Sequence, residues 1–263
     1  MLAVLSPAKS LDLEPTDRAL DFTQPALLDE TLALMRTTRK LKPADLARLM
    51  SISDKLAELN YDRFQAFETP FTAANAKPAA LMFAGDTYAG LKAPELDDDA
   101  LRWAQDHLGI LSGLYGLIRP LDLIQPYRLE MGTRLATRRG ANLYSFWGDR
   151  ITKRINAMTE AHADRTLVNL ASNEYFKAVR PEHLAGGVVT AVFKEIKDGQ
   201  PRMIGLTAKR ARGMMARWIV AGRVDRREGL KDFAVDDYAF QPALSSDTDW
   251  VYTRAWRTAA GFV

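Results

Sequence analysis

The sequence predicts one α+β domain, with a central mixed β-sheet flanked by helices. Short apolar runs typical of buried strands are interspersed with amphipathic helical patterns, without the strict strand-helix-strand repeat of a doubly wound sheet. Several strand-like runs cluster in about the last hundred residues. No shift in composition marks a linker, and 47% of the chain is hydrophobic, so we expect a single domain over residues 1–263.

Five apolar runs are expected to form buried strands, because each is bounded by proline, glycine, asparagine or a charged residue. They are residues 2–5, 80–84, 166–170, 188–193 and 203–207. Four amphipathic patterns predict helices over residues 26–39, 98–108, 146–158 and 208–221. The acidic run Asp97-Asp98-Asp99 suits the N-cap and first turn of the second helix better than a metal site, because no partner ligands lie nearby in the sequence.

The chain has no cysteine, which excludes disulfides, cysteine nucleophiles and Cys-ligated zinc or iron–sulfur sites. His107, His162 and His183 lack the spacing that would place two imidazoles on one helix face, so no metal is predicted. The segment 85–92 resembles a phosphate-binding loop but has Leu91 where the lysine should follow the second glycine. We therefore predict no cofactor.

No stretch combines a basic start with a long apolar run, and the longest apolar runs are far shorter than the roughly 20 residues of a membrane helix. We expect a cytoplasmic protein with no membrane partner and no obligate protein partner. The net charge of +3 is too small to identify a partner, so the distribution of charge must do so.

Residues 43–60 predict two helices joined by a short turn, with Pro43 in a first turn and Ser53 or Asp54 as a cap. Residues 49–57 match the helix-hairpin-helix pattern h-x-G-h-G-x-x-x-A, with serines at the glycine positions. In that motif the turn faces a nucleic-acid phosphate, which here implicates Ser51, Ile52, Ser53 and Lys55. A plain helical hairpin has the same apolar spacing and remains the alternative.

Basic residues concentrate in two runs. Residues 202–231 hold nine basic side chains against Asp225 and Glu228, and residues 134–154 hold six against Asp149. On one face these runs would form a track for phosphates; the alternative is a solvated face neutralised by acidic neighbours in space. The sharpest part is the helix that carries Lys209, Arg210, Arg212 and Arg217.

A second group of polar residues follows predicted strands or alternates with apolar ones, as active-site residues on loops do. These residues predict a polar cleft with acid–base or anion-binding chemistry, or else a buried polar network that holds the sheet ends together. They are Lys9, Tyr127, Arg128, Glu130, Asn173, Glu174 and Lys177.

Eight segments, in order along nearly the whole chain, together resemble the YaaA peroxide-stress family of bacterial proteins. They are residues 6–12, 49–57, 111–122, 125–132, 146–149, 169–172, 174–177 and 209–214. The resemblance implies a single α+β domain, a role in surviving hydrogen peroxide by limiting free intracellular iron, and a DNA-binding surface. That surface comprises the hairpin at Ser51–Lys55 and the basic motif, in which Lys209-Arg210 replaces the family's Lys-Lys.

The leading hypothesis is a cytoplasmic peroxide-stress protein that binds duplex or locally unpaired DNA through its phosphates, without sequence preference. Because the chain lacks thiols, its protection cannot be that of a cysteine peroxidase. The alternative is an enzyme that acts on a phosphorylated or nucleic-acid substrate in the polar cleft. Direct iron binding through carboxylates is a third hypothesis.

Overall fold

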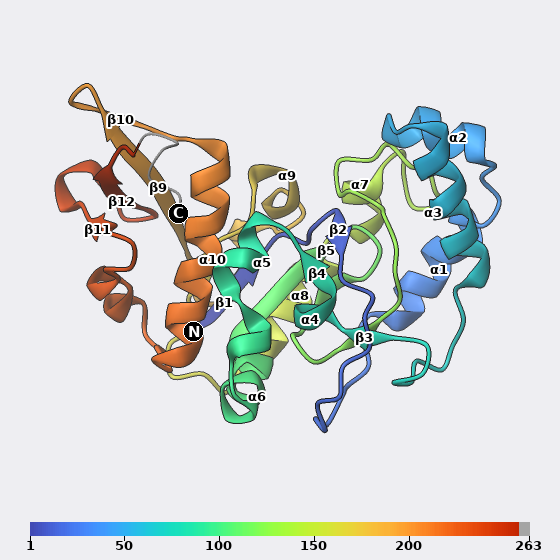
Figure 1. Ribbon diagram of the computed structural model, residues 1–263, viewed down its shortest axis with the longest axis horizontal. Helices are drawn as coiled ribbons and strands as arrows, with labels where there is room; N and C mark the ends of the chain where they lie inside the picture. The colour runs from blue at the N-terminus through green and yellow to red at the C-terminus, as the bar shows by residue number, and fades with distance from the viewer. Residues whose placement is uncertain (258–263) are drawn as a thin grey trace.

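The computed structural model describes residues 1–257 and is built on an eight-stranded mixed sheet (Figure 1). The strand order is β11-β12-β9-β8-β1-β5-β6, and β10 pairs with β9 outside this path. The strands are β1 (Leu2–Leu5), β5 (Leu108–Ser112), β6 (Gly116–Ile118), β8 (Leu167–Asn169), β9 (Val188–Lys197), β10 (Gln200–Arg202), β11 (Ala239–Phe240) and β12 (Asp249–Ala255). Two small ribbons pair β2 (Ser10–Leu11) with β4 (Phe83–Ala84), and β3 (Lys77–Pro78) with β7 (Leu123–Ile124).

The mixed sheet is confirmed, but its centre is parallel. Strands β5, β1, β8, β9 and β12 all run in one direction, and β6, β10 and β11 are antiparallel additions. All four residues of β1 have no exposed surface, as expected for a parallel strand covered on both faces. The fold is therefore closer to an α/β arrangement than the predicted α+β class suggests.

Helices cover the sheet and extend beyond it at one end. In Figure 1, α10 and α6 lie in front of the sheet and α8 lies behind it, while α1, α2 and α3 gather at the end of the molecule opposite β10–β12. Within residues 1–257, no helix combines the length and apolar character needed to cross a membrane. The helices are α1 (Leu28–Thr38), α2 (Pro43–Met50), α3 (Asp54–Ala66), α4 (Ala79–Met82), α5 (Asp86–Leu91), α6 (Asp98–His107), α7 (Leu143–Trp147), α8 (Arg150–Met158), α9 (Asn173–Phe176) and α10 (Gly205–Ala221), with 3-10 turns η1 (Ala93–Glu95), η2 (Pro181–His183), η3 (Arg227–Asp232) and η4 (Pro242–Leu244).

Two predicted strands are wrong in whole or in large part. Residues 80–82 belong to the buried helix α4 and only residues 83–84 form a strand, β4, because a short apolar run is equally suited to a buried helix and a buried strand. Residues 203–207 lie after the end of β10 and include the start of α10, and the apolar side chains of Met203 and Leu206 are exposed. The predicted helix 146–158 is divided at Gly148, whose positive φ of 50° ends α7 before α8 begins.

Helices α5 and α10 pack backbone against backbone. A Cβ atom on Gly213 would lie 1.7 Å from the carbonyl oxygen of Thr87, and one on Gly90 would lie 2.2 Å from that of Arg210. Only glycine permits such an approach. The contact places Thr87 beside the third turn of α10 and Gly90 beside the second, which prepares the site described next.

Candidate functional site

A cavity of about 410 Å³ opens at the carboxyl end of the parallel strands. The chain passes from β1 to β5 on one side, and later returns to form β8 on the other side of β1. This reversal makes the β1/β8 boundary a topological switch point, where open α/β sheets bind their ligands. Ser6 follows β1, Ser172 follows β8, and both line the cavity.

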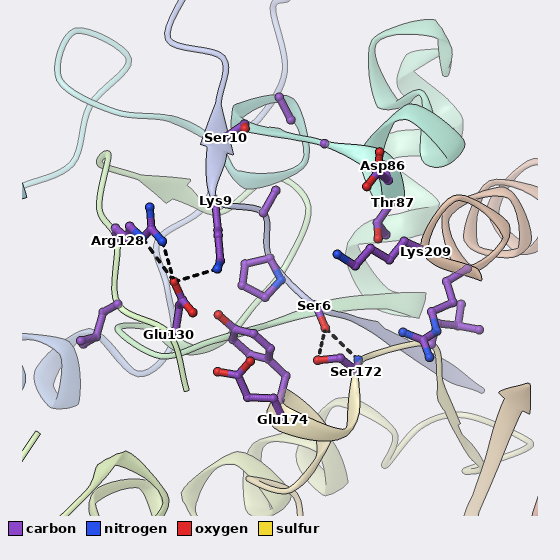
Figure 2. A pocket seen from close by; sticks show the side chains of 18 of the residues that line it. Ser6, Lys9, Ser10, Asp86, Thr87, Arg128, Glu130, Ser172, Glu174 and Lys209 are labelled. Carbon is purple, nitrogen blue, oxygen red and sulfur yellow. Dashed lines mark hydrogen bonds and ion pairs between the residues drawn. The ribbon is translucent and has the colours of Figure 1, made fainter. Parts of the chain in front are cut away.

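The two serines tie the strand ends together. The amide of Ser172 donates to Oγ of Ser6 at 2.9 Å, and the Ser6 hydroxyl donates to Oγ of Ser172 at 3.3 Å (Figure 2). The hydroxyl of Tyr88 donates to the Ser6 carbonyl at 3.0 Å. These bonds hold the base of the cavity in one geometry.

One side of the cavity carries a charged cluster centred on Glu130. The Lys9 amine lies 3.2 Å from Glu130 Oε1, and the Arg128 guanidinium donates to the same oxygen at 3.0 and 3.2 Å. Glu174 lies below the cluster in Figure 2, where its Oε1 accepts the amide of Gly132 at 2.8 Å. No group among residues 1–257 donates to the second carboxylate oxygen of either glutamate, so both remain acceptors for a ligand.

The other side of the cavity carries two cations from α10, Lys209 and Arg212. Neither pairs with a carboxylate in the part of the chain that the structure describes. Arg212 is half-buried, and burial lowers the pKa of its guanidinium from the ordinary value. An unpaired, partly desolvated cation is costly, and an anionic ligand would relieve that cost. Thr87 on α5 faces Lys209 across this end (Figure 2).

Apolar and aromatic side chains form a further part of the cavity lining, which we call its floor. Leu129 and Leu170 are fully buried there, and Tyr127 and Tyr175 add aromatic surface. The Tyr127 hydroxyl is already bonded to Ser112 at 2.6 Å, and burial raises its pKa far above the usual range, so it stays neutral. The tyrosine therefore contributes surface rather than charge.

Five of the seven predicted polar-cleft residues meet in this cavity, and two do not. Lys9, Tyr127, Arg128, Glu130 and Glu174 line it together. Residues 127–132 form no strand, although their side chains alternate between buried and partly exposed.

The two residues outside the lining lie at the two ends of α9. Asn173 is the exposed first residue of that helix, and Lys177 is exposed with its amine 5.2 Å from the centre of the Tyr144 ring. Neither is among the residues that line the cavity.

The basic residues predicted on α10 have different surroundings. Lys209 and Arg212 line the cavity, and Arg210 is exposed on the same helix. Arg217 is engaged inside the molecule, because its guanidinium donates to the carbonyl of Lys92 at 2.9 Å and lies 3.4 Å from a Glu95 oxygen.

The two helices predicted around the 51–53 turn are present. Ser51 adopts a left-handed φ of 52°, Ser53 caps α3 by accepting the Leu56 amide at 3.4 Å, and Pro43 opens α2. Lys55 is exposed. The binding of a phosphate by this turn, which would make it a helix-hairpin-helix, stays a prediction.

A second cavity of about 590 Å³ lies beside this hairpin. It is enclosed by the end of α1, by α2 and by residues 132–136, and it includes Arg48 and Arg134. Arg48 is paired with Asp45 at 2.8 Å. Residues 127–136 thus connect the two cavities, since the same segment contributes Glu130 to the first and Arg134 to the second.

The cavity residues that escaped the sequence-based prediction include Ser6, Ser172, Asp86 and Thr87. A signal existed for the serines, because both follow predicted strands that turn out to be parallel neighbours. The hypothesis of direct iron binding gains no support, since residues 1–257 contain no group of three or more His, Asp or Glu side chains arranged to hold a metal ion.

Comparison with known proteins identifies one family model and several relatives that match most of the chain. The family model described as "Peroxide stress protein YaaA" matches residues 1–244. A UPF0246 protein of Magnetococcus marinus is 55% identical over 257 residues, covering 97% of this chain and 99% of the relative. UPF0246 proteins of Alteromonas mediterranea and Caulobacter vibrioides are each 56% identical over 254 residues, covering 97% of this chain and 98% and 99% of the relatives. This chain belongs to the peroxide stress protein YaaA family.

Proposed function

We propose that the protein acts in peroxide stress as a cytoplasmic DNA-binding protein that holds phosphates of the DNA backbone and helps to limit free intracellular iron. The family supports the stress role. The observation that carries the DNA proposal is the pair of cations Lys209 and Arg212, which lack carboxylate partners within residues 1–257 and lie in a cavity at the switch point of the sheet. Contacts to phosphate carry no sequence information, so binding is expected to be non-specific.

A track for further phosphates leads from this pair toward the hairpin. Arg210 is exposed on the same helix, and residues 127–136 connect the first cavity to the second, where Arg134 is exposed. The second cavity adjoins α2, which leads into the turn at Ser51–Lys55. Each phosphate that a cation neutralises adds about 0.9 to the slope of log affinity against log salt for duplex DNA.

The test measures the affinity of the folded protein for a duplex at several salt concentrations. Lys209→Glu combined with Arg212→Glu is expected to weaken binding. It should also make the slope of log affinity against log salt shallower, by the amount that about two phosphate contacts contribute. Lys55→Glu should lower the slope by about one contact. The matched control is Lys153→Glu, an exposed lysine on α8 away from the cavity. Affinities and slopes equal to wild type in both site variants would refute this DNA surface.

The proposed effect on iron is tested in cells under hydrogen peroxide. Chelatable ferrous iron, measured by electron paramagnetic resonance of whole cells, should be higher when the protein is absent. The Lys209→Glu, Arg212→Glu double variant should fail to restore the wild-type level if iron control depends on DNA binding. Equal iron in cells with and without the protein would refute the proposed role.

A second candidate function is an enzyme that acts on a phosphorylated or nucleic-acid substrate in the first cavity. It is favoured by the two carboxylates Glu130 and Glu174, which face the same space as the cations Lys9 and Lys209. Carboxylates with one free oxygen are suited to accept a proton. Wild type and Glu130→Gln should then differ in the products that mass spectrometry detects after incubation with phosphorylated substrates or DNA. No product with wild type would leave binding as the function of the cavity.

A further inference from the structure

We infer that the cavity at the switch point binds one nucleotide unit, a phosphate together with the sugar and base that it carries. The inference rests on the proposed function for the identity of its anionic end, and it adds a ligand class and an orientation. It is argued from three chemically different parts of the same cavity: a cationic end, an apolar floor and a hydrogen-bonding end.

The cationic end selects a phosphate. Lys209 and Arg212 bring two positive charges from successive turns of α10, and the Thr87 hydroxyl lies opposite Lys209 (Figure 2). Within the described residues neither cation forms an ion pair, although the Asp86 carboxylate also lines this end of the cavity. A guanidinium with an ammonium and a hydroxyl supplies the charge-assisted donors that phosphate oxygens accept.

The apolar floor requires more than an inorganic anion. Apolar atoms supply more of the cavity's accessible surface than polar atoms do, and Pro7, Ala8 and Tyr175 are among the residues that line it. A phosphate ion alone would leave this surface in contact with water. A flat ring that extends from the phosphate would cover it, as bases do on aromatic and aliphatic side chains.

The hydrogen-bonding end is able to read the polar edge of such a ring. Lys9 and Arg128 both bind one oxygen of Glu130, which fixes the carboxylate and leaves its second oxygen as an acceptor. Glu174 presents a second fixed acceptor, because Gly132 holds its other oxygen. Lys9, with 64% of its side chain exposed, still has hydrogens to donate. Amino groups and hydroxyls of a nucleotide match this set of donors and acceptors.

The volume agrees with a ligand of this size. A cavity of about 410 Å³ falls in the range typical of small-molecule sites, about 300–1,000 Å³. The nucleotide has two possible sources with the same chemistry, a free mononucleotide or one unpaired nucleotide of a DNA strand. The two arms of the experiment separate them.

In the first arm, calorimetry measures binding of free deoxynucleoside monophosphates, with the matching nucleosides and inorganic phosphate as probes of each half. A monophosphate should bind with one site per chain and at least about tenfold more tightly than either half, since each end adds about 1–3 kcal/mol. Arg212→Met should abolish the advantage over the nucleoside. Glu130→Gln should abolish the advantage over inorganic phosphate, and Lys153→Met should change neither.

In the second arm, three duplexes of one length are compared: fully paired, with one unpaired nucleotide, and with the same extra position lacking its base. The duplex with an unpaired nucleotide should bind about tenfold more tightly than the other two, because its base reaches the cavity without breaking a pair. Glu130→Gln should remove this difference, whereas the control Lys153→Met should keep it.

The outcomes separate this inference from the proposed function. Tight monophosphate binding without a preference among duplexes identifies the free nucleotide as the ligand, and the reverse result identifies the DNA strand. If the protein neither binds a monophosphate nor prefers the duplex with an unpaired nucleotide, the inference is overturned, even if Lys209 and Arg212 prove to hold the DNA backbone. If every variant binds DNA as the wild type does and the wild type binds a monophosphate tightly, the proposed function is overturned and the inference stands.

Discussion

Four basic residues of α10 look alike in the sequence and differ in the folded protein. Lys209 and Arg212 point into the cavity, Arg210 is exposed, and Arg217 binds the carbonyl at the end of α5. Helical periodicity separates a buried face from a polar one, but it does not say which polar side chains meet a neighbouring element. The local excess of positive charge was therefore visible in the sequence. Which of these side chains line the cavity and which bind elsewhere depends on the neighbouring helix α5.

The same limit applies to Glu130 and Glu174. The sequence indicated both as polar residues on loops, and the structure brings them to one cavity. Their roles depend on Lys9, which is more than one hundred residues away in the chain. Residue type predicts possible chemistry, and only the sheet topology decides which groups share a site.

At the residue scale, the buried pair Arg254–Glu195 gives a prediction about stability. Both side chains are 2% exposed and lie 2.6 Å apart on paired positions of β12 and β9. Glu195→Ala leaves the Arg254 charge buried with the partly exposed Asp236 as its one carboxylate partner among residues 1–257, and should lower the free energy of unfolding by about 3–5 kcal/mol.

Urea denaturation measures this change. The control is Glu228→Ala, which breaks an exposed ion pair with Arg227 and should leave the unfolding midpoint unchanged. Equal midpoints for Glu195→Ala and wild type would show that the buried pair does not stabilise the fold.

At the element scale, the sequence predicted helices better than strands. The helices over α1, α6 and α10 and the strands β1, β8 and β9 are confirmed, with shifted ends. β5 was missed because Leu108 follows the last residue of α6 without a break, so its apolar residues continue the helical pattern. β12 was missed because Asp249 and Arg254 make it look polar, and Arg254 is buried only by pairing with β9.

The packing of α5 on α10 predicts the effect of one methyl group. Gly213→Ala places a Cβ where Thr87 has its carbonyl oxygen, so the two helices must separate. Such overpacking is expected to cost about 1–3 kcal/mol or more of stability, and to weaken DNA binding by moving Lys209 and Arg212 away from Thr87.

The control lies on the same helix. At Gly205 an added Cβ meets nothing within 4 Å, so Gly205→Ala should stabilise the protein slightly through helix propensity and leave DNA binding unchanged. Thermal unfolding and the duplex titration measure both effects. A Gly213→Ala variant that binds DNA as wild type does would show that the helix spacing does not set the site.

At the scale of the whole molecule, the proposed phosphate track joins two ends of the structure. The cavity lies at the sheet, and the Ser51–Lys55 turn belongs to the α1–α3 end (Figure 1). A chain of 263 residues has a radius of gyration of about 18 Å, so a duplex of about 15 base pairs reaches across it and one of about 5 base pairs does not.

Duplex length therefore distinguishes one track from two separate patches. Lys55→Glu should weaken binding of the 15-base-pair duplex and not that of the 5-base-pair duplex, while Lys209→Glu should weaken both. Fluorescence anisotropy with labelled duplexes gives the four affinities. An equal effect of Lys55→Glu on both lengths would contradict the single track.

The central position of β1 also governs when this protein is able to fold. β1 is made near the start of synthesis, yet its two neighbours in the sheet are β5 and β8, which end at Ser112 and Asn169. At about 5–20 residues per second, the fully apolar strand waits roughly 8–35 seconds on the ribosome for its second partner. During that interval the nascent chain exposes an aggregation-prone segment, so covering this strand by a chaperone is expected to raise the yield of folded protein.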